Sequence, residues 1–486
     1  MKVVFSDVFR NVFIKSNILK KGILSLVGTF LIKAVNLISI PVFSRLMSTD
    51  EYGDISIFMT YVSIFTVLLG LDFQAAVSRG CLDFKDKKNQ FLSVGVAFTT
   101  FYSFIVFGIV NLFHSYFCQL LSLDWFQLNI LLLYSYASFL ISYMSAEYIF
   151  YFNYKMNTLL GMTVALCNFG LSVVLIETIY NNNPFLGRAL GASVPTILIA
   201  ASLLLYLLYR GRALFYKQYI LYFIKMGVPV IPHSLSHLVL SNSDKVMIDN
   251  MIGSKENGIY SLVYNVGWML SALTEALNNV WIPWMFRKME GGNVSLLRSA
   301  FNLYMAGYAI VTIILESISP EIVMLISPSG YWDGIDVVIW IIFSSYLIFM
   351  YILYVNLEFY EKRTTLIPIG TIMAAAINII LNACFLKEYG YQFAAISTVL
   401  SYVALVVFHM CMVIFVLKKK VINSGLFVLF IGIVFCISCI QQLFIDKLLI
   451  RLLVMIVSDF LIGLGSLLFY KRLKEESKDK GEIAEL

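Results

Sequence analysis

Long apolar runs separated by short polar loops are the feature that most constrains this chain. A helix needs ~20 apolar residues to cross a bilayer. Hydrophobic residues make up 60% of the 486 residues and charged residues 13%, against about 25% charged residues in soluble proteins. A soluble core cannot bury this much apolar surface. The continuous runs also differ from the ~10-residue alternating strands of a membrane β-barrel.

The sequence therefore predicts an all-α polytopic membrane protein with about fourteen transmembrane helices. The expected spans are 21–44, 55–77, 90–113, 125–147, 157–179, 187–209, 226–248, 258–283, 299–319, 335–357, 364–386, 391–417, 422–442 and 447–470.

Lysine and arginine residues set the expected orientation. With the N-terminus inside, most of the 35 Lys and Arg residues fall in inside loops, as the positive-inside rule requires. This pattern predicts an even number of spans and two cytoplasmic termini. The N-terminal segment lacks the pattern of a cleavable signal, so the first span is expected to act as an uncleaved anchor.

Three short motifs recur about 205 residues apart, which indicates an internal repeat. The pairs are Glu51-x-Gly53 with Glu256-x-Gly258, Asn168-x-x-x-Ser172 with Asn378-x-x-x-Asn382, and Gly187-x-x-x-Gly191 with Gly390-x-x-x-Ala394. They predict two six-helix lobes related by a pseudo-two-fold axis along the membrane normal, one of the layouts of transporters.

The expected domains follow from this repeat. They are an interfacial amphipathic helix at 1–20, an N-terminal lobe at 21–209, a cytoplasmic interfacial linker at 210–225, a C-terminal lobe at 226–417, two extra helices at 418–470 and a charged cytoplasmic tail at 471–486.

Several stretches resemble the polysaccharide flippases, which carry O-antigen and capsule repeat units. These flippases belong to the multidrug/oligosaccharidyl-lipid/polysaccharide exporter superfamily. The stretch Gly227-Val-Pro229-Val-Ile-Pro232, followed by Ser243-Asp244-Lys245 and Gly258-Ile-Tyr260, is similar to their seventh and eighth helices. The first turn, Ser44 to Gly53, resembles their first-helix signature, and Glu388-Tyr389-Gly390-Tyr391 resembles the start of their twelfth helix.

The resemblance implies a function, a location and partners. The function is the translocation of an undecaprenyl-diphosphate-linked oligosaccharide from the cytoplasmic to the outer leaflet by alternating access, for O-antigen or another surface polysaccharide. The location is the bacterial inner membrane. A polysaccharide polymerase and a chain-length regulator are candidate partners. We expect a monomer with no nucleic-acid partner and no catalytic residues.

Charged residues inside the spans are candidates for the substrate cavity, because charge in a bilayer is costly and usually faces the bundle interior. Lys33, Arg79 and Lys245 would offset the negative charge of a lipid diphosphate, and Asp244 and Glu275 complete the set. The alternative is structural: Lys33 pairs with Glu275, Lys245 with Asp244, and Arg79 anchors a span end.

A coupling cation, Na⁺ or H⁺, is the one cofactor considered. Asn378 and Asn382 share a helix face, and Thr398 in the next span can approach them. Related lipid II flippases bind sodium in this region, where their carboxylate is replaced by Asn in this chain. Amide and hydroxyl oxygens suit a hard cation. The competing interpretation is helix packing through small polar residues, and no firm metal site is predicted.

Two histidines are candidates for proton coupling. His233 and His237 are four residues apart and follow Pro229 and Pro232, which are expected to bend the seventh span. The competing interpretation is ordinary hydrogen bonding inside the bundle.

Two other functions stay open at this point. A multidrug or cation antiporter of the same superfamily would favour acidic cavity residues over lysines. A membrane glycosyltransferase or polymerase would need a large outer loop with catalytic residues, and the longest outer loop, 319–334, contains no Lys, Arg or His. The chain also lacks a phosphate-binding P-loop motif.

Overall fold

A computed structural model describes residues 17–291, 294–363, 366–419 and 421–479, and these residues form helices and no strand. By length and composition, twelve of the described helices can cross a membrane. The prediction of an all-α polytopic membrane protein is confirmed. The contacts divide the chain into two compact units, with unit 1 ending at Asn242 and unit 2 beginning at Ser243.

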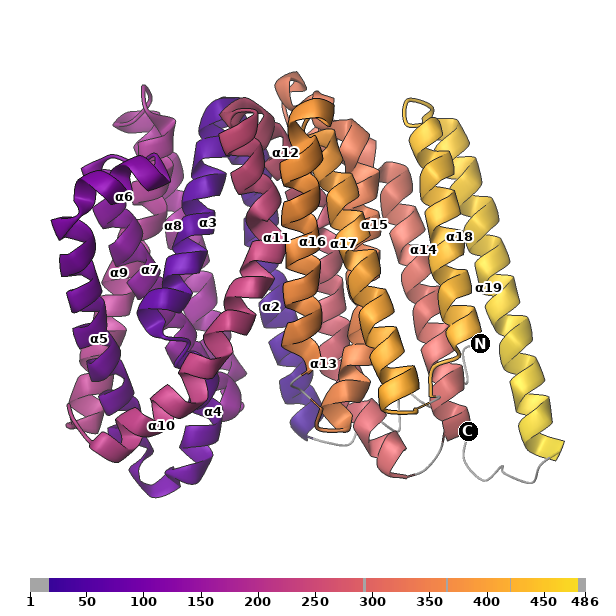
Figure 1. Cartoon of the computed structure of the whole chain (residues 1–486), viewed down its shortest axis with the longest axis horizontal. Helices are drawn as coiled ribbons and strands as arrows, with labels where there is room; N and C mark the ends of the chain where they lie inside the picture. The colour runs from indigo at the N-terminus through magenta and orange to yellow at the C-terminus, as the bar shows by residue number, and fades with distance from the viewer. Residues whose placement is uncertain (1–16, 292–293, 364–365, 420, 480–486) are drawn as a thin grey trace. The chain divides into compact units, whose positions relative to one another are not determined.

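Unit 1 is a bundle of long helices (Figure 1). Its helices are α2 (Asn17–Leu46), α3 (Thr49–Gly70), α4 (Gln74–Asp83), η1 (Lys85–Lys87), α5 (Lys88–Leu112), α6 (His114–Leu121), α7 (Trp125–Phe150), α8 (Tyr154–Thr178), α9 (Pro184–Gly211), α10 (Lys217–Gly227), η2 (Val228–Val230) and the first part of α11 (Ile231–Met251). α7 packs against α3 and α9, and α8 packs between α2 and α9.

Capping side chains define where helices of unit 1 begin. The Ser48 hydroxyl accepts the Glu51 amide at 3.3 Å, and the Glu51 carboxylate accepts the Ser48 amide at 2.8 Å. This capping box satisfies donors that the first turn of a helix leaves free. Asp124 and Gln127 form the same arrangement at the start of α7. The capping box at Ser48 explains why α3 begins six residues before the predicted span 55–77.

The short helix α10 lies across one end of the unit 1 helices (Figure 1). It is held there by an aromatic stack: the ring of Phe223 lies 4.3 Å from that of Phe91 in α5 and 4.8 Å from that of Phe73. All three rings are buried. The expected interfacial helix at 1–20 lies almost entirely outside the described residues, and the predicted domain boundaries stay predictions.

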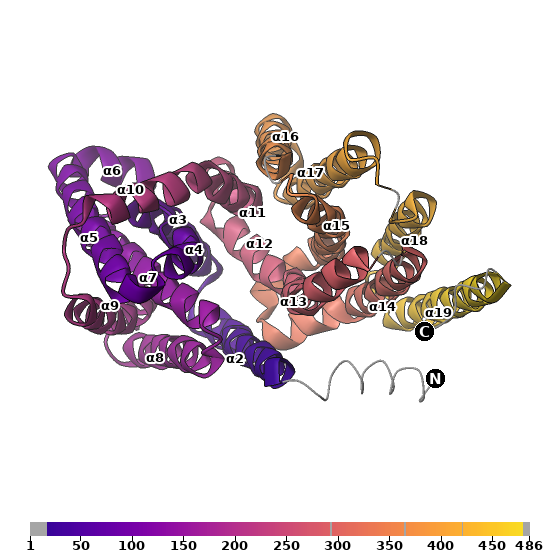
Figure 2. The same ribbon diagram turned by 90° about the horizontal axis from the view of Figure 1, so that it is seen from below.

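Unit 2 is built around α15. Its helices are the second part of α11, α12 (Ser254–Gly267), α13 (Met269–Glu290), α14 (Val294–Ile326), η3 (Ser329–Gly334), α15 (Ile335–Tyr360), α16 (Leu366–Tyr389), α17 (Gln392–Cys411), the π-turn η4 (Met412–Val416), α18 (Ser424–Leu443) and α19 (Leu448–Asp479). α15 packs against α12, α13, α14, α17 and α18, and α19 lies at the margin of the unit, against α14 and α18 (Figure 2).

Two predicted spans are interrupted. The span expected at 55–77 breaks after Gly70, where Leu71 and Asp72 have left-handed backbone angles, φ 49° and 52°. The span expected at 258–283 consists of two helices that meet at Trp268. Interrupted spans are tolerated where they line a cavity or are buried in protein.

Candidate functional site

A buried carboxylate lies at the centre of a polar cluster in unit 2. Asp244 of α11 is 2% exposed. Its Oδ1 accepts a hydrogen bond from Nδ2 of Asn382 at 2.7 Å, and its Oδ2 accepts one from the Tyr260 hydroxyl at 2.9 Å. The hydroxyl of Thr398 also donates to Oδ2. Four helices, α11, α12, α16 and α17, therefore converge on one carboxylate.

Further oxygen-bearing side chains complete this group, which we call the Asp244 cluster: Ser243, Asp244, Tyr260, Asn378, Asn382, Ser397 and Thr398. Ser243 donates to Oδ1 of Asn378 at 2.7 Å, and Ser397 donates to Oδ1 of Asn382 at 2.6 Å. The amide of Asn378 donates to the Thr398 hydroxyl at 3.3 Å. The structure thus brings together residues that the sequence placed in two separate sets.

Local sequence explains how α16 and α17 meet at the Asp244 cluster. Gly390, with φ +71°, follows the end of α16, a conformation that glycine adopts without steric cost. The tight turn makes the two helices neighbours. It places Ser397 beside Asn382 although the two residues are fifteen positions apart. The small residues Ala394 and Ala395 are buried in α17 and allow close approach.

The donor set of the Asp244 cluster suits a monovalent hard cation. It offers one carboxylate, amide oxygens and hydroxyls, and hard cations take oxygen ligands. A single negative charge, buried in a membrane helix, is costly unless it is paired. A cation of charge +1 matches it. Within the described part of the chain, no group of three His, Cys, Asp or Glu residues is placed to bind a metal ion.

A related polar pair lies at the matching repeat positions of unit 1. Asn168 of α8 donates to Thr196 of α9 at 3.0 Å, as Asn378 of α16 does to Thr398 of α17. The guanidinium of Arg188 donates to Ser172 at 2.9 Å, where unit 2 has Asn382 in the Asp244 cluster. A fixed positive charge disfavours a cation there, so the two units carry different versions of one motif.

Lys245, the neighbour of Asp244 in sequence, is buried, interacts electrostatically with Asp244 and has a further partner. Its ammonium nitrogen lies 4.9 Å from the centroid of the Tyr264 ring, within the range of a cation–π interaction. The Tyr264 ring in turn stacks on Trp268 at 5.4 Å. The expected binding of substrate by Lys245 stays a prediction.

The other predicted cavity charges lie apart from the Asp244 cluster in sequence and on other helices. Lys33 is half-buried in α2, and Glu275 is exposed on α13. Arg79 is exposed on α4, with its Nε 3.1 Å from a carboxylate oxygen of Asp83. An exposed pair within one helix contributes little to stability, so Arg79 is available to other partners. The substrate-binding roles of these three residues stay predictions.

His233 and His237 line a cavity of about 670 Å³ in unit 1, which we call the Asp72 cavity. It lies between α3, α7, α11 and the break at Leu71 and Asp72. Asp72 is 4% exposed. It accepts a hydrogen bond from Ser234 at 2.5 Å and another from Gln74. Asp72 lies near the end of the predicted span 55–77, and the sequence gave no signal that the chain breaks beside it.

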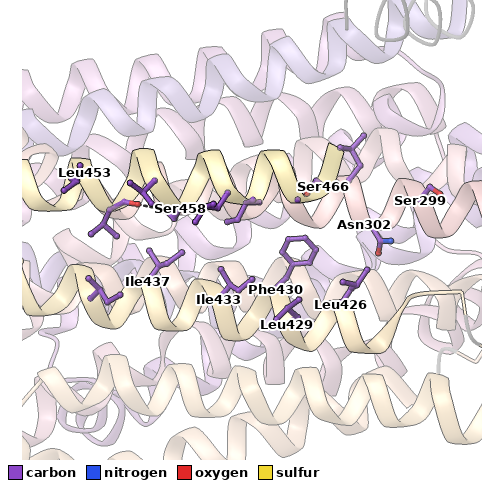
Figure 3. A pocket seen from close by; sticks show the side chains of 17 residues that line it. Ser299, Asn302, Leu426, Leu429, Phe430, Ile433, Ile437, Leu453, Ser458 and Ser466 are labelled. Atoms are coloured by element: carbon purple, nitrogen blue, oxygen red, sulfur yellow. Dashed lines mark hydrogen bonds between the residues drawn. The ribbon is translucent and has the colours of Figure 1, made fainter. Parts of the chain in front are cut away.

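An apolar groove of about 730 Å³ runs between α14, α18 and α19, and we call it the α18–α19 groove. Figure 3 shows Ile433, Ile437 and Leu453 along it, with Ser299 and Asn302 at one end. Asn302 is 6% exposed, and neither side-chain atom has a hydrogen-bond partner. The two extra helices were predicted from their hydropathy, but the sequence carried no signal for a groove between them.

Solved structures with this fold are two-lobe membrane transporters. The chain resembles the lipid II flippase MurJ in an inward closed conformation, with a TM-score of 0.70 and 14% identity over 93% of this chain and 99% of that one. It also resembles a multidrug resistance MATE family transporter of the MOP superfamily in an inward-facing conformation. That match has a TM-score of 0.56 and 13% identity over 82% of this chain and 99% of the other.

The sequence comparisons identify the family. The family model described as "Polysaccharide biosynthesis protein" matches residues 18–289, more than half of the chain. The chain belongs to this family, as its motifs predicted. An uncharacterised membrane protein of Haemophilus influenzae is 23% identical over 74% of this chain and 88% of its own length. The Lsg locus putative protein 1 of the same organism is 22% identical over 74% and 90%.

Proposed function

We propose that this protein is a flippase that moves an undecaprenyl-diphosphate-linked oligosaccharide from the cytoplasmic to the outer leaflet of a bacterial inner membrane, by alternating access, for O-antigen or another surface polysaccharide. The family and the MurJ-like fold support the proposal. The observation that carries it is the α18–α19 groove, because a polyprenyl carrier needs an apolar path that a small soluble substrate does not.

The groove matches the chemistry of a lipid tail. Twelve of the seventeen residues that line it are Leu, Ile, Val or Phe, and a buried methylene group contributes ~0.8 kcal/mol to lipid binding. Asn302 at one end offers both a donor and an acceptor without partners. The tail of the carrier occupies the groove, and the Asn302 amide forms a hydrogen bond with a polar atom at the end of the tail.

We assign the binding of the diphosphate and of the coupling cation to different residues. Lys33, Arg79 and Lys245 supply positive charge for the diphosphate. The Asp244 cluster holds Na⁺, with Asp244, Asn378 and Asn382 as oxygen ligands once they give up their present hydrogen bonds. Proton coupling through His233 and His237 stays a prediction, as does association with a polysaccharide polymerase.

The first test is a deletion strain complemented with variants. Loss of surface polysaccharide, together with lipid-linked repeat units in the cytoplasmic leaflet, supports the flippase. Units that accumulate in the outer leaflet point instead to a polymerase. Unchanged polysaccharide in a strain without a second flippase contradicts the proposal and makes drug export the next function to test.

A pair of tryptophan variants tests the groove itself. Ile433→Trp places a large ring in the groove and is expected to abolish complementation. Val428 lies on the same helix, is 55% exposed and does not line the groove. Val428→Trp is therefore the control and is expected to complement the deletion strain. Equal complementation by the two variants at equal protein levels would show that the groove is not required for flipping.

A further inference from the structure

The Asp72 cavity is larger than an ion needs. Its volume of about 670 Å³ falls within the ~300–1,000 Å³ range of small-molecule pockets, whereas one water occupies ~30 Å³. It forms where two interrupted helices meet: the break between α3 and α4, and the turn η2 between α10 and α11. A Cβ on Gly227 would lie 2.9 Å from the carbonyl oxygen of Leu71, so glycine allows the two breaks to touch.

The cavity is rich in hydrogen-bonding groups. Hydroxyl groups come from Ser63, Thr66, Ser138 and Tyr134. The side chains of His233 and Gln74 each present a buried atom, Nδ1 and Oε1, that has no hydrogen-bond partner. Buried polar atoms are normally paired. A ligand with several hydroxyl groups would satisfy both of them.

The charge of the cavity is negative. Among the described residues that line it, Asp72 is the one acid, and none is Lys or Arg. Each oxygen of Asp72 accepts one hydrogen bond, from Gln74 and from Ser234, while an ionised carboxylate has about four acceptor positions. Asp72 therefore keeps acceptor capacity for ligand hydroxyl groups and repels a ligand carboxylate or phosphate.

We infer that the Asp72 cavity is the site where unit 1 binds the sugar part of the substrate, and that it accepts uncharged sugars and rejects acidic ones. This inference rests on the proposed function. A sugar ring offers hydroxyl groups at its edge and C–H groups on its faces. Ser63, Ser138 and Asp72 bind the hydroxyl groups, and Met59, Val62 and Leu238 contact the faces.

The test uses the purified full-length protein in lipid nanodiscs and two synthetic polyprenyl-diphosphate lipids. One carries glucose and the other glucuronic acid, so the two sugars differ only at C6, which is a CH₂OH group in the first and a carboxylate in the second. Binding is measured at pH 8, where an ordinary imidazole is neutral. The wild type is expected to bind the neutral lipid about tenfold more tightly, since one nearby like charge opposes the acidic one.

Three variants distinguish a specific role of Asp72 in sugar binding from a general loss of folding. Asp72→Asn is expected to bring the affinity ratio close to one, while Asp83→Asn, a carboxylate of α4 outside the cavity, keeps the tenfold ratio. Ser138→Leu fills part of the cavity without touching the Asp72 bonds and is expected to weaken binding of the neutral lipid about tenfold. Thermal unfolding of each variant identifies any that fail to fold.

The outcomes distinguish this inference from the proposed function. If the wild type binds both lipids equally, or if its preference survives Asp72→Asn, the sugar site is overturned and the flippase stands. If the wild type binds neither lipid, the proposed function is overturned and this inference with it. A lost preference in Asp72→Asn with a retained one in Asp83→Asn supports the site.

Discussion

Asn382 donates a 2.7 Å hydrogen bond to Asp244, a residue 138 positions earlier in the chain and on another helix. Through this bond, α11 supplies a carboxylate to the Asp244 cluster, to which α16 and α17 contribute the amides of Asn378 and Asn382 and the hydroxyls of Ser397 and Thr398. The related lipid II flippases have a carboxylate in this region where this chain has Asn, and this difference weakens the transfer of their sodium site to this chain. The structure shows that one carboxylate is still present, contributed by α11.

We expect Na⁺ to stabilise the wild type against thermal unfolding and to lose this effect in Asp244→Asn. The amide keeps the shape of the carboxylate but removes the charge that a cation would pair with. The measurement compares unfolding temperatures in sodium chloride and in choline chloride at equal ionic strength. Asp249→Asn, on the same helix, is the control and is expected to respond to Na⁺ as the wild type does. A sodium response that survives in Asp244→Asn would contradict the site.

Thr398→Val should destabilise unit 2 by about 1–3 kcal/mol, because it leaves a donor of Asn378 and an acceptor position of Asp244 without a partner. Thr398→Ser restores the hydroxyl and is expected to recover most of the loss. Denaturant unfolding in detergent measures both variants. Identical stability of the valine and serine variants would show that the hydroxyl is not required.

Gly390→Ala is expected to destabilise the protein by roughly 1–2 kcal/mol, the cost of a left-handed conformation for a residue with a Cβ. The turn it occupies sets the register of α16 against α17. Gly432, in the middle of α18, has open space around its Cβ position. Gly432→Ala is therefore the control and should be neutral or stabilising by about 0.5–1 kcal/mol. Thermal unfolding compares the two; a neutral Gly390→Ala would mean that the turn relaxes freely.

Gly191→Ala should destabilise unit 1 by about 1–3 kcal/mol, since its Cβ would overlap the backbone of Ser172 on the neighbouring helix. Gly170→Ala, on α8 where the Cβ would meet open space, is expected to have no such cost. Yields of folded protein and unfolding temperatures report the difference. Equal behaviour of the two variants would mean that α8 and α9 can separate without penalty.

The all-α polytopic fold was predictable because apolar length acts over whole spans. The motif repeats also had a physical meaning: Asn168 and Asn378 each bond a threonine on the next helix. What sequence could not supply were contacts between distant helices. Nothing in the order of residues indicates that Asp244 contacts both Tyr260 and Thr398. Likewise, Asp72 lies near the end of a predicted span, and its contact with Ser234 depends on the break at Leu71, which the sequence does not indicate. The α18–α19 groove depends on how far two apolar helices stand apart, which hydropathy does not encode.

The two versions of the asparagine–threonine pair bear on the energy source of transport. In unit 1 the positively charged Arg188 lies close to the pair and donates to Ser172, whereas in unit 2 the threonine of the pair donates to the carboxylate of Asp244. With one carboxylate among these side chains, the proposed site carries a single cation in each cycle. One elementary charge that crosses a membrane potential exchanges ~2.3 kcal/mol per 100 mV. Flipping by this protein would therefore respond to voltage as well as to the concentration of Na⁺, and a collapsed membrane potential would slow it even where the sodium gradient is intact.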